Sequence, residues 1–115
     1  VNQQFDSIAR LLQVLIHYEW ESENLVISLV RRHKRYLQKQ STPFKTELTI
    51  LKYLNRLAKT IDKTTKLSLL KKLKIDLEAL KENTFEQPVF GYFPFIKWVE
   101  VQMNGKKLKE VLKQK

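Results

Sequence analysis

The chain of 115 residues is long enough for one domain with a single core, and its hydrophobic content of 43% is that of a globular protein. It has no cysteine, which excludes disulfides and thiolate chemistry, and its longest apolar run is shorter than a membrane span of about 20 residues. The formal net charge of +10 is uneven: residues 31–74 have a net of +12, whereas residues 1–30 have a net of −3.

Apolar residues recur at helical spacing from the beginning of the chain. The first predicted helix runs from Gln3 to Tyr18 and is apolar on two adjacent faces, so it should pack on more than one side. Ser22 is the predicted N-cap of the second helix. The buried face of that helix is expected to hold Val26, Val30, His33 and Leu37.

The third helix is predicted to begin at Thr42 as N-cap, with Pro43 in the first helical position. Two apolar stripes follow, one made of Phe44, Leu48, Leu51, Leu54 and Ala58, the other of Ile50, Tyr53, Leu57 and Ile61. Asp62 or Thr64 is expected to cap a fourth helix that runs to about Glu82. On its outer face, i, i+4 ion pairs are predicted for Lys72/Asp76 and Lys74/Glu78.

The segment Phe85–Met103 holds six of the twelve aromatic residues of the chain. Pro94 removes a backbone donor, so a helix break is expected at Tyr92–Phe93, with a new helix from Pro94 to Met103. We expect this helix to turn Phe95, Trp98, Val99 and Met103 inward as the closing plug of the core. The pair Asn104-Gly105 is a helix stop, and a last short helix is predicted over 106–113.

These elements predict an all-α fold of five to six antiparallel helices, either the end of an α-solenoid or a compact helical bundle. We expect residues 1–115 to form a single helical domain. Because the chain begins with valine, we expect it to be a fragment of a longer protein, and the absence of cysteine fits a reducing, cytoplasmic compartment.

A family resemblance is carried by IARLLQVLIHYEW, ELTILKYLNRLAK and above all YFPFIKWVEVQMNG. These segments resemble the C-terminal part of a group of long, uncharacterised bacterial helical proteins, which are similar to tetratricopeptide-like repeat proteins. In that group a closing pattern YF-x-F-I-x-W-[LV]-E is common, often with Asp where this chain has Pro94. The tetratricopeptide consensus itself is absent. The resemblance implies the end of a helical solenoid and no particular activity.

Basic side chains of the second and third predicted helices are candidates for nucleic-acid binding, because lysine and arginine neutralise phosphates. The candidates are Arg31, Arg32, Lys34, Arg35, Lys45, Lys52, Arg56 and Lys59. The alternative is an ordinary solvated surface, since no recognition helix or interleaved aromatic platform accompanies the basic run.

Tyr92 and Trp98 are candidate partner-binding anchors, with core packing as the favoured alternative. Arg10 and His17 share one polar stripe and are similar to the Arg…His motif of HEPN-class ribonucleases, whose sites assemble only in a dimer. His33 lies on an apolar face and is expected to be a hydrogen-bonded core histidine. No catalytic residue, metal site or cofactor is predicted.

The sequence therefore predicts a non-enzymatic interaction or scaffold module with a protein partner and no membrane insertion. The second hypothesis is a nucleic-acid-binding helical domain that uses residues 31–74. The third is a ribonuclease-like helical domain.

Overall fold

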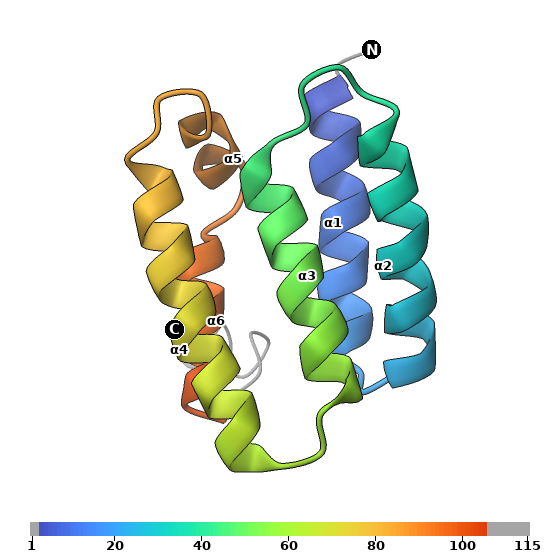
Figure 1. The fold of residues 1–115 in the computed structure, drawn as a ribbon, viewed down its shortest axis with the longest axis vertical. Helices are drawn as coiled ribbons and strands as arrows, with labels where there is room; N and C mark the ends of the chain where they lie inside the picture. Colours follow the sequence, from blue (N-terminus) through green and yellow to red (C-terminus); the bar gives the residue numbers. More distant parts are fainter. Residues whose placement is uncertain (1–2, 106–115) are drawn as a thin grey trace, which may run out of the picture.

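The structure, a computed structural model, describes residues 3–105. Within this range the chain forms six α-helices and no strand (Figure 1), so the all-α class is confirmed. The helices are α1 (Gln3–Glu19), α2 (Glu23–Gln38), α3 (Lys45–Lys59), α4 (Lys63–Lys81), α5 (Gln87–Tyr92) and α6 (Phe95–Met103). The helix predicted over 106–113 lies outside the described residues.

Helices α1 to α4 pack as antiparallel neighbours in chain order around one core, and α6 packs on α4. Helix α1 packs on both α2 and α3, as its two apolar faces predicted, and α4 packs between α3 and α6 (Figure 1). The radius of gyration is 13.7 Å, close to the roughly 13 Å of a compact domain of this size. Residues 3–105 are therefore arranged as a compact helical bundle.

Leucine-rich stripes meet at the centre of this bundle. Predicted core residues that are fully buried there include Leu11, Leu37, Leu51, Leu54, Leu57, Leu73 and Leu77. One residue of the predicted stripes is instead largely exposed, Ile61 by 94%. Ile61 lies beyond the end of α3 in the connection to α4, where no helix turns its side chain inward.

The aromatic segment closes the core as expected. Helix α5 ends at Tyr92, Phe93 is extended, and Pro94 is the N-cap of α6, which confirms the predicted break. Trp98 is only 2% exposed, and its Nε1–H donates to Glu19 Oε1 at 2.7 Å. This bond ties α6 to the end of α1, and the helix stop at Asn104-Gly105 is confirmed by Gly105, whose φ is 71°.

The beginning of α3 differs from the prediction. Thr42 does not cap it, because Phe44 is the N-cap and the helix starts at Lys45. The capping acceptor is the buried carboxylate of Glu86, which receives the backbone N–H of Lys45 at 3.1 Å and of Thr46 at 2.8 Å. The Thr46 hydroxyl donates to it as well, at 2.8 Å. A negative charge is favourable at a helix N-terminus, so this distant residue supplies what a local cap would.

Helix α4 begins as predicted. Asp62 is its N-cap and accepts the backbone N–H of Thr65 at 2.8 Å. This bond and a second one from the Thr65 hydroxyl lower the pKa of Asp62 below its usual value.

The i, i+4 ion pairs predicted on α4 are replaced by contacts with other helices. Lys74 pairs with Glu100 of α6 at 3.1 Å, and Asp76 accepts the Tyr53 hydroxyl of α3 at 2.8 Å. Both residues lie where α4 meets a neighbour, so tertiary partners compete with those on the same helix.

Replacing Trp98 tests its place in the core. Trp98→Ala removes a large buried side chain and should lower the free energy of unfolding by about 3–5 kcal/mol. Trp20→Ala is the matched control, since Trp20 is 65% exposed, and should cost less than about 1 kcal/mol. Chemical denaturation measures both; equal losses would show that Trp98 does not hold the core together.

Replacing Glu86 tests the cap of α3. Glu86→Ala leaves the buried N–H of Thr46 and the partly buried N–H of Lys45 without an acceptor and should cost about 3 kcal/mol. Glu82→Ala, at an exposed position nearby, should change stability by no more than about 0.5 kcal/mol. Urea titrations that showed similar midpoints for the two variants would contradict the capping role.

Candidate binding sites

One buried carboxylate, that of Glu47, bonds to side chains of two other helices and so joins α1, α2 and α3. Glu47 of α3 is fully buried, and its Oε1 accepts the Ser7 hydroxyl of α1 at 2.6 Å. His33 Nε2 of α2 lies 3.2 Å from the same oxygen. His33 is thus a hydrogen-bonded core histidine, as expected. Glu47 was not singled out from the sequence, although its place three and four residues before Ile50 and Leu51 puts it on a buried face.

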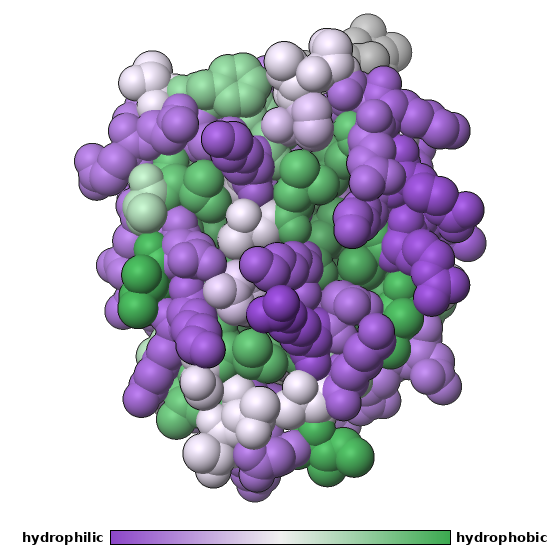
Figure 2. All heavy atoms as spheres, in the orientation of Figure 1, coloured by the Kyte–Doolittle hydropathy of each residue, from purple (hydrophilic) through white to green (hydrophobic). Residues whose placement is uncertain are grey.

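A groove runs along the outer side of α2 and α3, and we call it the basic groove. Its charged lining is Arg31 and Lys34 from α2 and Lys52, Arg56 and Lys59 from α3. Ile27, Val30, Leu48 and Leu51 form its apolar floor, and its volume is about 640 Å³. Figure 2 shows hydrophilic side chains over these two helices on either side of hydrophobic ones.

Among residues 3–105, no acidic side chain lines the basic groove. Five cationic side chains therefore face one hollow without local neutralisation, which creates a field that attracts anions. The lining also contains no aromatic residue, so the groove offers phosphate contacts and no platform for stacking bases.

The other predicted basic residues lie outside this groove. Arg32 and Arg35 are exposed on α2, and Lys45 lines a separate hollow with Asp76. The structure thus brings five of the eight candidate cations together. Lys45 lies instead beside Asp76 of α4, and its backbone N–H donates to Glu86.

The two predicted partner-binding aromatics lie in different environments. Trp98 is buried in the core, where its ring meets Tyr18 at 5.9 Å between centroids. Tyr92 is 39% exposed, with its ring 6.3 Å from that of Phe5. Of this pair, only Tyr92 presents a surface to a partner.

Arg10 and His17 do not meet within one chain. They are two turns apart on α1, about 10 Å along the axis. The Arg10 guanidinium lies 4.3 Å from the centre of the Tyr36 ring, and His17 contacts the Trp20 ring edge-on.

Residues 3–105 hold no group of three or more His, Cys, Asp or Glu side chains that would bind a metal ion. Nor is any helix in this part of the chain long and apolar enough to cross a membrane.

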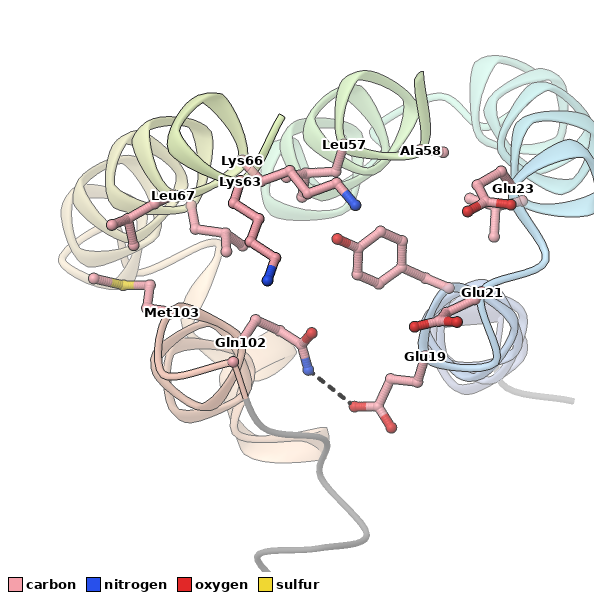
Figure 3. Close-up of a pocket in the computed structure, with 14 residues that line it drawn as sticks. Glu19, Glu21, Glu23, Leu57, Ala58, Lys63, Lys66, Leu67, Gln102 and Met103 are labelled. Atoms are coloured by element: carbon pink, nitrogen blue, oxygen red, sulfur yellow. Dashed lines mark hydrogen bonds between the residues drawn. The ribbon is translucent and has the colours of Figure 1, made fainter. Parts of the chain in front are cut away.

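A second hollow, which we call the end cavity, opens where α1, α2, α3, α4 and α6 come together at one end of the bundle (Figure 3). Its volume is about 470 Å³. Glu19, Glu21 and Glu23 lie on one side, and Lys63 and Lys66 of α4 lie opposite them. Sequence patterns missed this cavity, because its two charged walls are some forty residues apart in the chain.

The phenol of Tyr18 lines the end cavity. Burial raises the pKa of Tyr18 above its usual value of 10.0, and the negative charge of Glu23 raises it further. The hydroxyl is therefore neutral at physiological pH and acts there as a hydrogen-bonding group.

Comparisons of the chain with protein-family models, curated proteins and solved structures find no match.

The raised pKa of Tyr18 predicts a change of stability at high pH. The unfolded chain ionises this phenol near pH 10.0, before the folded chain does, so the folded state loses stability as the pH rises above that value. Tyr18→Phe removes this loss. The difference between the two unfolding free energies should therefore stay constant between about pH 6 and 9, and above pH 10 the wild type should lose stability relative to Tyr18→Phe. Curves that stayed parallel throughout would contradict a perturbed Tyr18.

Proposed function

We propose that the chain is a cytoplasmic, non-enzymatic binding module that binds a polyanion in the basic groove. Nucleic acid is the favoured polyanion. The observation that carries this proposal is the convergence of five cations from α2 and α3 on a hollow whose lining contains no acidic residue. Nucleic-acid binding was the second hypothesis from the sequence, and this convergence moves it ahead of the scaffold hypothesis.

The spacing of the cations suits a phosphate backbone. Lys52, Arg56 and Lys59 follow one another at i, i+4 and i+7, so they extend over about 10 Å of α3. Each strand of a duplex has one phosphate about every 3.4 Å of helix axis, so this row extends along about three phosphates when it lies parallel to that axis. Arg31 and Lys34 add a second rim from α2. Contacts of this kind do not read bases, so we expect little dependence on sequence.

A protein partner is the second candidate, as expected of a scaffold module. It is supported by large apolar side chains that are exposed outside the groove, notably Trp20, Ile16 and Leu25. The resemblance to tetratricopeptide-like repeat proteins also stays a prediction, and the packing of α1, α2, α3 and α4 on their neighbours in sequence supports it.

The proposed function predicts salt-sensitive binding. A labelled RNA oligonucleotide should bind with a Kd of about 1–100 μM at low salt, and raising the salt from about 50 to 200 mM should weaken binding steeply. Fluorescence anisotropy measures both quantities. Lys52→Gln/Lys59→Gln removes two cations of the groove and should lower the magnitude of the log–log salt slope by about 1.5.

Lys71→Gln/Lys81→Gln is the matched control, because it removes the same charge from exposed positions of α4 outside the groove. It should change affinity far less. Equal losses of RNA affinity in the two double variants would show that binding depends on net charge alone and not on the basic groove. No binding of RNA or duplex DNA at low salt would refute the proposed function.

A further inference from the structure

The end cavity has charges of both signs that do not neutralise one another. Figure 3 shows Lys63 and Lys66 extending from α4 towards the hollow, with Glu21 and Glu23 directed at it from the opposite wall. The ion pairs within residues 3–105 are His33–Glu47 and Lys74–Glu100, so none of them crosses the cavity. Within residues 3–105, the two charged walls thus face each other across the hollow without an ion pair between them.

The third carboxylate of the cavity already has a structural task. Glu19 Oε1 accepts hydrogen bonds from Trp98 at 2.7 Å and from Gln102 at 3.2 Å, the latter drawn in Figure 3. Glu19 therefore fixes the end of α1 against α6 and forms part of the wall of the end cavity. Glu21 and Glu23, in the α1–α2 connection and the first turn of α2, are the acids that face the hollow from an exposed position.

Between the charged walls the lining is apolar. Val26, Leu57 and Leu70 are buried beneath it, while Leu67 and Met103 are only partly covered. An aliphatic group placed in the cavity would remove Leu67 and Met103 from water, which is favourable. The Tyr18 hydroxyl, neutral because its pKa is raised, adds one hydrogen-bonding group.

We propose that the end cavity binds a short zwitterionic peptide, with its carboxylate at Lys63 and Lys66, its ammonium group at Glu21 and Glu23, and an aliphatic side chain between them. A purely anionic ligand would meet the carboxylate wall, and a purely cationic one the lysines, so only a ligand with both charges satisfies both sides. The volume of about 470 Å³ falls within the roughly 300–1,000 Å³ of ligand pockets. This site is separate from the basic groove and does not depend on the function proposed for it.

The probe is the tripeptide Gly-Leu-Leu, used with its N-acetylated and C-amidated forms and titrated into the ¹⁵N-labelled full chain. The free peptide should bind saturably in the millimolar range and shift amides of residues that line the end cavity. Blocking either end should weaken binding by about fivefold to tenfold, because one charge-assisted contact is lost.

Two double variants assign each end of the peptide to a wall. In Lys63→Gln/Lys66→Gln, amidation of the peptide should no longer reduce affinity, whereas acetylation still should. In Glu21→Gln/Glu23→Gln the pattern should reverse. Lys52→Gln/Lys59→Gln, in the basic groove, should bind all three peptides as the wild type does. Amide spectra show that each variant is folded.

The proposal is overturned if no saturable shift occurs with millimolar peptide. It is overturned equally if both blocked peptides bind as well as the free one, or if the shifts map to the basic groove. Because the RNA titration reports on α2 and α3, failure of the peptide site and failure of the polyanion site are distinguishable.

Discussion

The carboxylate of Glu47 is the constraint on which the arrangement of the first three helices depends. A buried carboxylate is costly unless it is hydrogen-bonded, and its bonding partners here come from α1 and α2. Leucine stripes alone allow helices to slide past one another with little change in buried area, whereas Ser7 and His33 reach Glu47 at one register only. That register sets the rims of the basic groove, because Arg31 and Lys34 flank His33 on α2.

Burial of acids also shapes the surface charge. Residues 31–74 contain only two acids, of which Glu47 is in the core and Asp62 caps α4. Because Glu47, the only acid of α3, lies in the core, the surface of α3 carries four basic side chains and no acidic one. Two further acids are likewise used in structural hydrogen bonds: Glu86 caps α3, and Glu19 ties α1 to α6. The acids that stay exposed near α1 form one wall of the end cavity.

Local patterns predicted most of the helices and little of what joins them. Helical periodicity, Pro94 and the cap at Asp62 are encoded within a few residues, and each was confirmed. The cap of α3 was missed because its acceptor, Glu86, lies forty residues away in sequence. Spacing placed Lys52, Arg56 and Lys59 on one line, but which cations of α2 meet them depends on helix packing. The end cavity has no local signal at all, for the same reason.

The most direct test of this account is a map of the amides that shift when an RNA oligonucleotide is added to the ¹⁵N-labelled chain at low salt. The account predicts that the shifts concentrate on residues around Arg31, Lys34, Lys52, Arg56 and Lys59, on two helices held in register by Glu47. Shifts spread evenly over all exposed lysines, or centred on α4 and α6, would contradict it.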